Sequence, residues 1–457
     1  MIKVEPGISP SEFSLWEEVR TLARMSAPVS AGQVGLMAMG VTDLLMVGPL
    51  GEGALASLAM GNIWSFGVLI FGIGALTGLD PVFSQAFGAG DRLALARSLS
   101  RACVLGLILS VPILGAHLVA SDVLTAMGQP AAIVPIAAQY CDALAWGIPS
   151  TLLFVACRQF LQGMGKMAPA TWVILGANLL NILCNWLFIY GHWGFEAMGV
   201  EGAGWATTCV RWMMPIGLLL ISHRTFRRYL VEWRRGMDAR AIGRLLWLGG
   251  PVGVQISLEV WAFGLSGIMM GWLGANALAG HSIALNLSGV IFMIPFGLGS
   301  AAATRIGNRL GAGKPWARSG WTSVGLGACI MLMSALLFFL FPEPLAQLYT
   351  RDAAVLTAAV SLLPIAAAFQ LFDGLQVVAQ GVLRGGGDTR FPALANLLGF
   401  YGVGLPVGAM LAFRWGYGAQ GVWWGLVVGL GVVAGILLLR LRSVARKGGR
   451  LVATELE

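Results

Sequence analysis

Long apolar stretches recur along the chain and are separated by short polar segments. A helix that crosses a bilayer needs about 20 apolar residues, and twelve stretches of about this length are present. Stretches such as 328–341 (ACIMLMSALLFFLF) do not alternate between apolar and polar positions, as barrel strands do. The pattern therefore predicts an all-α integral membrane protein with twelve transmembrane helices, at 26–49, 59–82, 98–119, 134–155, 168–190, 200–221, 246–271, 279–302, 320–341, 357–381, 391–413 and 420–440.

The composition supports this prediction and excludes other classes. Charged residues make up 11% of the 457 residues and hydrophobic residues 57%, whereas a soluble domain carries roughly 25% charged residues. A soluble enzyme, a disordered chain and a secreted disulfide scaffold are therefore excluded. The cysteines lie in or beside apolar stretches without a CxxC pair, so we interpret them as small buried hydrophobes: Cys103, Cys141, Cys157, Cys184, Cys209 and Cys329.

The positions of the basic residues predict the orientation. With the N-terminus in the cytoplasm, 26 of the 29 Lys and Arg residues fall in cytoplasmic segments, and only Arg351 and Arg414 fall in outer loops. Cytoplasmic loops of membrane proteins carry such an excess. We therefore expect both termini in the cytoplasm. The net charge of +8 is explained by topology, and no nucleic-acid partner is expected.

A repeat with a period near 223 residues divides the chain. Pro28-Val29 recurs as Pro251-Val252, Gly88-Ala89-Gly90 as Gly311-Ala312-Gly313, and Ala177-Asn178-Leu179-Leu180 as Ala395-Asn396-Leu397-Leu398. Each repeat holds six spans, so the halves run parallel and are expected to be related by a pseudo-twofold axis along the membrane normal. The predicted parts are a cytoplasmic N-terminal segment (1–25), an N-lobe (26–221), a basic cytoplasmic linker (222–244), a C-lobe (245–440) and a cytoplasmic tail (441–457).

Three carboxylates lie deep in the predicted spans, with no Lys or Arg one turn away: Asp43, Glu259 and Asp373. A charge at the centre of a span costs roughly 2.5–3.5 kcal/mol on insertion scales, so such residues face a protein interior or a watery cavity. A carboxylate in such a place can bind Na⁺ or take up H⁺. We therefore expect cation or proton sites there.

Polar and aromatic residues accompany these acids at helical spacing. Phe369 and Gln376 lie at i−4 and i+3 from Asp373, and Gln255 lies at i−4 from Glu259. In span 5, Asn181 and Asn185 continue a stripe that begins at Asn178. For this stripe, interhelical hydrogen bonding and a polar site both stay open.

Three further ionisable residues lie in or at the ends of spans. Asp80 and Asp142 lie near the interfaces, where capping or solvation is expected. Arg211 lies within span 6 and has no partner that the sequence identifies.

Several segments resemble the multidrug and toxic compound extrusion (MATE) family in its NorM-like branch. The resemblance covers about residues 20–440, and six segments occur in the right order at the right spans. They are MGVTDLLMVGPLG (39–51), SQAFGAGD (84–91), RQFLQGMGKMAPA (158–170), NILCNWLFIYG (181–191), AGHSIALNLSGVIFMIPFGLGSAAATRIGNRLGAG (279–313) and DGLQVVAQGVLRGGGDT (373–389). The resemblance implies antiport: export of amphiphilic cationic drugs or dyes across the bacterial inner membrane in exchange for H⁺ or Na⁺, by alternating access, with a role in antibiotic resistance.

The resemblance also implies roles for single residues. Asp43 matches the first-helix acid of the family, and Glu259 and Asp373 match the C-lobe acids, where Na⁺ could bind. Asn181 and Asn185 match polar positions near the first-helix acid, although position 185 is an aspartate in some relatives of other branches. Phe369 stands where relatives can carry an aromatic residue close to the cation site.

Two other functions compete with drug export. An exporter or flippase of one dedicated lipid or metabolite is the alternative, but a large anionic substrate would need basic residues in the spans, and only Arg211 is available. An enzyme is disfavoured, because no HExxH, GxSxG or Walker A motif occurs. We therefore expect no enzyme activity and no cofactor apart from the coupling ion H⁺ or Na⁺. A monomer is expected to suffice for function.

Overall fold

The computed structural model describes residues 14–230 and 238–452, and within these ranges the chain is helical without strands. Eleven helices are long and apolar enough to cross a membrane, or twelve if one bent pair counts as a single span. The membrane-length helices are α1 (Leu15–Val47), α2 (Glu52–Thr77), which α3 (Asp80–Gly88) continues, α4 (Arg92–Leu118), α8 (Ala168–Tyr190), α9 (Gly199–Ile221), α11 (Ala239–Trp272), α12 (Ala275–Gly311), α13 (Ala317–Leu340), α15 (Ala353–Gly385) and α18 (Gly418–Lys447), together with a composite span.

The composite span consists of α16 (Phe391–Asn396), η3 (Leu397–Gly404), α17 (Leu405–Ala409) and η4 (Met410–Arg414), in which η3 and η4 are π-helical. The bent pair consists of α6 (Val134–Ala145) and α7 (Ile148–Gly163). Short helices complete the chain at its loops, namely η1 (Gly48–Leu50), α5 (Ala120–Ala126), α10 (His223–Leu230) and α14 (Pro342–Gln347).

One expected span is not continuous. The sequence predicts a single helix over 134–155, but α6 ends at Ala145 and α7 begins at Ile148 with a bend of 48°. Pro149 lies in the first turn of α7, where its missing N–H costs nothing. The same proline could not donate a hydrogen bond inside a continuous helix.

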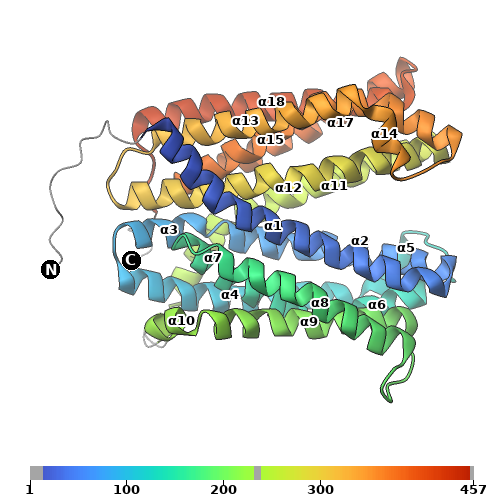
Figure 1. Ribbon diagram of the computed structural model, residues 1–457, viewed down its shortest axis with the longest axis horizontal. Coiled ribbons are helices and arrows are strands. Elements are labelled where there is room, and N and C mark those ends of the chain that lie inside the picture. Colours follow the sequence, from blue (N-terminus) through green and yellow to red (C-terminus); the bar gives the residue numbers. More distant parts are fainter. Residues whose placement is uncertain (1–13, 231–237, 453–457) are drawn as a thin grey trace.

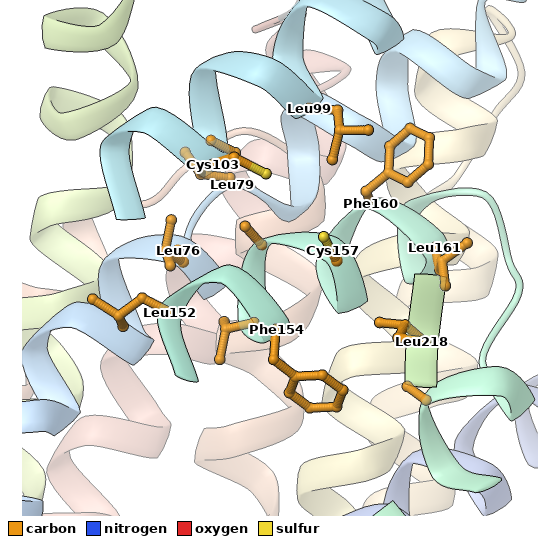
Figure 2. Close-up of a cluster of buried hydrophobic side chains, with 14 of the residues drawn as sticks. Leu76, Leu79, Leu99, Cys103, Leu152, Phe154, Cys157, Phe160, Leu161 and Leu218 are labelled. Carbon is orange, nitrogen blue, oxygen red and sulfur yellow. The ribbon is translucent and has the colours of Figure 1, made fainter. Parts of the chain in front are cut away.

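The helices form two bundles, each with its own hydrophobic core. One core gathers residues of α2 to α10, and the other gathers residues of α12 to α18. In Figure 1 the blue and green helices form one layer, which we call the first bundle, and the yellow to red helices form the second bundle. A close-up of the first core shows Leu79, which lies between α2 and α3, together with Leu99 of α4 and Phe160 of α7 (Figure 2).

Four of the six cysteines behave as the sequence predicts. Cys103 and Cys157 lie in the first core (Figure 2), and Cys141 and Cys184 are also buried. The prediction is wrong for Cys209 and Cys329, which are exposed on the surface of the protein. Both lie on membrane-length helices. Hydrophobic side chains are widely exposed on such helices, because the surface they form faces lipid.

Two helices cross from one bundle to the other. The first half of α1 places Leu22 in the second core, and its later half places Met39 in the first core. Figure 1 shows α1 beginning beside the second bundle and ending in the first. The helix α11 does the reverse, with Leu245 in the first core and Ala262 in the second. Leu22 and Leu245 are 223 positions apart, and so are Met39 and Ala262. The repeat in the sequence therefore appears in the structure as two helices that cross between the bundles in opposite directions.

The bundles approach closely where the facing residues are small. A Cβ on Gly74 would lie 2.8 Å from the Gly253 Cα, and the residues 223 positions from these, Gly297 and Ser30, also meet. We use the name inner end for the side of the molecule at which α1 begins. The helices α3, α12, α15 and α18 finish at the same side. There a Cβ on Gly311 would lie 2.0 Å from the Gln85 carbonyl oxygen. Small residues let helix backbones pack this closely, and they close the inner end.

We predict that the substitution Gly311→Ala destabilises the protein. The new methyl group meets the backbone oxygen of Gln85, which cannot rotate away, and overpacking of this kind costs roughly 1–3 kcal/mol. The matched control is Gly325→Ala on α13, where a Cβ meets nothing within 4 Å. The midpoint of thermal unfolding in detergent should fall for the first variant and stay or rise slightly for the second. Equal midpoints in both variants would contradict the close packing.

Candidate functional sites

The first site surrounds Asp43 near the outer end of α1. The side chain is 3% exposed. Its Oδ1 accepts hydrogen bonds from Asn181 Nδ2 at 3.1 Å and Asn185 Nδ2 at 2.6 Å, and its Oδ2 accepts one from Thr207 Oγ1 at 2.9 Å. Three helices, α1, α8 and α9, therefore supply one hydrogen-bonded cluster.

The local sequence explains how α8 reaches this acid. Asn181 and Asn185 are four residues apart and so share one face of α8. Gly35 lets α1 approach that helix, since a Cβ there would lie 2.9 Å from Ile174. Asn178 belongs to the same stripe but donates to the Gly35 carbonyl oxygen at 2.9 Å. It joins the two helices and does not contact Asp43.

Arg211 brings a positive charge to this site. It lies four residues after Thr207 on α9 and is close enough to Asp43 and Tyr140 to interact with both electrostatically. One of its guanidinium nitrogens, Nη1, is buried without a hydrogen-bond partner. The structure thus places Arg211 near Tyr140 and Asp43, neighbours that the sequence could not name, and the site holds residues of both charge signs.

The second site surrounds Glu259 and Asp373 in the second bundle. Glu259 Oε1 accepts a hydrogen bond from Gln376 Nε2 at 2.9 Å, and Oε2 accepts one from Asn396 Nδ2 at 3.2 Å. Asn396 in turn accepts from Gln380 Nε2 at 3.1 Å. Helices α11, α15 and α16 therefore meet in a chain of amides that ends on the carboxylate.

Of the three acids that the sequence singles out, Asp373 has the fewest hydrogen-bond partners. It is 5% exposed and is close enough to Glu259 for electrostatic interaction. Its Oδ1 and the Oε1 of Gln376 are both buried without a hydrogen-bond donor. Buried polar atoms in proteins almost always have a partner. The first site leaves one oxygen, Asn185 Oδ1, without a donor, whereas the second site leaves two beside a second carboxylate.

The other predicted residues lie near this site without contacting its acids through hydrogen bonds. Phe369 lies one turn from Asp373 and packs against Phe263 at 5.9 Å and Trp423 at 5.4 Å between ring centroids. Gln255 is buried one turn before Glu259, but the hydrogen bonds to Glu259 come from α15 and α16. Phe369 therefore forms part of an aromatic wall.

Two residues that donate hydrogen bonds to the acids are not predicted by the sequence analysis. Asn396 occupies the position that the repeat aligns with Asn178, and this alignment was the signal that could have found it. Thr207 has no such signal, because its neighbour Thr208 is also buried and donates to the Ala143 carbonyl oxygen instead. Only packing distinguishes the two threonines.

The expectation for Asp80 is wrong. The sequence favours capping or solvation, but the residue is 1% exposed and its Oδ2 accepts a hydrogen bond from Arg384 Nε at 2.9 Å. Its Oδ1 accepts one from Gln159 Nε2 at 2.5 Å. Since Asp80 lies on α3 and Arg384 on α15, this buried ion pair joins the two bundles at the inner end. Asp142 is exposed, as expected of a solvated acid.

Two six-span bundles related by a repeat, each with buried acids among amides, define a multi-pass membrane protein built for transport. The MatE family model matches residues 28–187 and 251–410, two ranges that begin 223 residues apart. The chain belongs to this MATE family and to its NorM-like branch.

Curated relatives match nearly the whole chain. The probable multidrug resistance protein NorM of Burkholderia pseudomallei (strain K96243) is 36% identical over 94% of this chain and 93% of its own length. The multidrug resistance protein PmpM of Pseudomonas aeruginosa is 35% identical over 94% of this chain and 92% of its own length.

Solved structures share the fold. The eukaryotic MATE transporter AtDTX14 is 23% identical with a TM-score of 0.87, and covers 97% of this chain and 100% of its own. The Vibrio cholerae MATE transporter VcmN in the bent form is 18% identical with a TM-score of 0.83, and covers 95% of this chain and 98% of its own.

We predict that Asp80→Asn strongly destabilises the protein. The substitution leaves Arg384 largely buried without its acid, and breaking a buried pair in this way costs about 3–5 kcal/mol. The matched control is Asp142→Asn, an exposed acid near a span end, which should change stability by no more than about 0.5 kcal/mol. Thermal unfolding in detergent compares them, and a similar midpoint for both variants would show that the pair contributes little.

Proposed function

We propose that this chain is a multidrug efflux transporter of a bacterial cytoplasmic membrane, which exports amphiphilic organic cations in exchange for H⁺ or Na⁺. The family and the names of the relatives, multidrug resistance proteins NorM and PmpM, support this function. The excess of basic residues in alternate loops supports cytoplasmic termini. One chain contains both bundles, which supports a monomer as the functional unit.

The second site is proposed to bind the coupling cation. The observation that carries this proposal is the pair of buried oxygens without donors, Asp373 Oδ1 and Gln376 Oε1, next to the Glu259 carboxylate. Buried oxygens without donors are costly. A proton on a carboxylate, or a Na⁺ ion held by Glu259 and Asp373, would satisfy them. Carboxylate and amide oxygens suit hard cations.

The first site is proposed to bind a cationic drug or a proton more weakly than the second site binds its cation. Asp43 already accepts three hydrogen bonds and lies near Arg211. A cationic drug or a proton that binds there must compete with these partners. Among the described residues the aromatic and methionine side chains could supply an adaptable apolar wall for varied drugs.

Alternating access would follow from the two crossing helices. The bundles touch through small residues and through the Asp80–Arg384 pair at the inner end, which supports an arrangement closed toward the cytoplasm. Rocking the bundles about α1 and α11 would open that end. Cation binding at the acids would weaken drug binding in the outward state, because both ligands are positive and compete for the same negative charge.

The alternative, an exporter or flippase of one dedicated lipid or metabolite, is not favoured, because the relatives are named as multidrug resistance proteins. The MATE family also implies a transporter and not an enzyme. The coupling mechanism needs no cofactor besides the ion itself.

We predict that Asp373→Asn and Glu259→Gln each reduce the rate of gradient-driven ethidium efflux at least tenfold, which corresponds to about 1.4 kcal/mol or more of activation free energy. Each variant replaces a carboxylate of the cation site with an amide of nearly the same size. The matched control is Asp352→Asn. Asp352 caps the start of the same helix, α15, and this variant should transport normally. Proteoliposomes with equal amounts of reconstituted protein provide the measurement. Normal efflux in both site variants would refute the assignment of the site.

We also predict efflux under an imposed H⁺ or Na⁺ gradient. Efflux from proteoliposomes that persists in Na⁺-free buffer with a proton gradient would assign the coupling to H⁺, and efflux that requires Na⁺ would assign it to Na⁺. No efflux under either gradient would refute antiport.

A further inference from the structure

The last described segment of the chain crosses from the second bundle to the first. It follows α18, and at its start Trp316 Nε1 of the second bundle donates to the Gly448 carbonyl oxygen at 3.0 Å. At its end, Val452 is 4% exposed and belongs to the first core. We call residues 448–452 the strap, because they connect the two bundles at the inner end.

One side chain of the first bundle holds the strap. Gln85, near the end of α3, is fully buried. Its Oε1 accepts a hydrogen bond from Val452 N at 2.7 Å, and its Nε2 donates to the Arg450 carbonyl oxygen at 3.1 Å. The same Nε2 donates to the carbonyl oxygen of Gly385, the last residue of α15, at 3.3 Å. A single amide of the first bundle is therefore bonded to the strap and to the second bundle.

The loop that follows α15 contacts the strap from the side of the second bundle. Arg450 N donates to the Gly386 carbonyl oxygen at 2.9 Å. Gly387 has a left-handed φ of 84°, and a Cβ there would lie 2.6 Å from the Arg450 carbonyl oxygen. A residue without a side chain lets the two backbones approach this closely. Arg450 is thus anchored to the second bundle through its backbone.

A second amide joins the bundles at the symmetric position. Asn308 on α12 lies 223 positions after Gln85. In the orientation that satisfies its neighbours, its side-chain nitrogen donates to the Ser84 carbonyl oxygen at 2.7 Å and to the Gly163 carbonyl oxygen at 3.0 Å. Gly163 ends α7 as Gly385 ends α15. Each repeat therefore contributes one amide that bonds to the opposite bundle.

The strap breaks this symmetry. Tyr229, which lies 223 positions before Val452, belongs to α10 and packs with Phe226 in the first core. In the part of the chain that the structure describes, the corresponding segment of the first repeat thus stays in its own bundle. The strap is an additional connection, and its release leaves the bonds of Asn308 and the Gln85–Gly385 bond in place.

We propose that the strap holds the inner end closed, and that its release from Gln85 is required before this end opens toward the cytoplasm. A single residue, Leu451, separates Arg450, which is anchored to the second bundle, from Val452 in the first core. The strap therefore has no spare length, and the bundles cannot separate here unless one of the two anchors breaks. This inference rests on the alternating access proposed above.

The test follows the distance between the bundles with spin labels at Arg92→Cys on α4 and Arg318→Cys on α13. Both positions are exposed at the inner end, and Cys209→Ser and Cys329→Ser remove the exposed native thiols. The two helices pack in different cores, so loosening of the strap alone leaves their separation unchanged. Pulsed electron paramagnetic resonance in nanodiscs, without drug or gradient, gives the ratio of separated to closed molecules.

Two variants release the strap in different ways. In the first, the chain ends after Gly449 and lacks the residues that bond to Gln85. The second, Val452→Asp, keeps the whole chain and places a carboxylate where the first core buries a valine, which is unfavourable. The matched controls are a chain that ends after Val452, which keeps every contact described for the strap, and Leu451→Asp at a position that is 46% exposed.

Each strap variant should raise the ratio of separated to closed molecules about fivefold or more, because the net contribution of one buried hydrogen bond changes an equilibrium by about this factor. The controls should match the wild type. An unchanged ratio in both strap variants would overturn the proposal, as would an equal rise in the controls. If the wild type exports no ethidium, a raised ratio still supports the strap. If it does export ethidium, an unchanged ratio refutes the strap alone.

Discussion

The absence of hydrogen-bonding partners in the bilayer interior constrains the rest of this structure. Lipid cannot solvate an amide or a carboxylate, so each polar group in a span must find a partner on another helix or from its cargo. Asp43 meets this requirement with three donors from α8 and α9. Glu259 meets it with amides from α15 and α16. Asp373 does not meet it fully, because Oδ1 has no donor.

The same constraint explains why the bundles meet through small residues. Apolar side chains gain little by leaving lipid for another helix, so close packing of backbones must supply the attraction. Gly74 with Gly253, and Gly297 with Ser30, do this at symmetric positions. Because α1 and α11 each contribute to both cores, the bundles are linked by two helices that can tilt, while the interior of each bundle stays packed.

Much of the architecture was predictable from the sequence. The apolar stretches predict the spans because lipid requires them, and charge scarcity makes Asp43, Glu259 and Asp373 conspicuous. The break between α6 and α7 was not predictable, since Gly147 and Pro149 occur within an apolar stretch like those of continuous spans. The partners of the acids were also hidden. Asp80 and Arg384 are 304 residues apart, and Thr207 is distinguished from Thr208 only by which helix it faces.

The broken symmetry of the two sites bears on how coupling could work. The repeat preserves the helices but duplicates none of the acids, so the two bundles offer a cation different environments. At Asp43 the carboxylate already accepts three hydrogen bonds, and Arg211 is close enough to interact with it electrostatically, so a cation that binds there must compete with these neighbours. At Asp373 and Glu259 two acids lie together with unpaired oxygens, so a cation relieves both repulsion and lost hydrogen bonds. The larger gain therefore lies in the second bundle, which supports placing the coupling ion there. The weaker, adjustable attraction at Asp43 suits a site that must release its ligand when the bundles move.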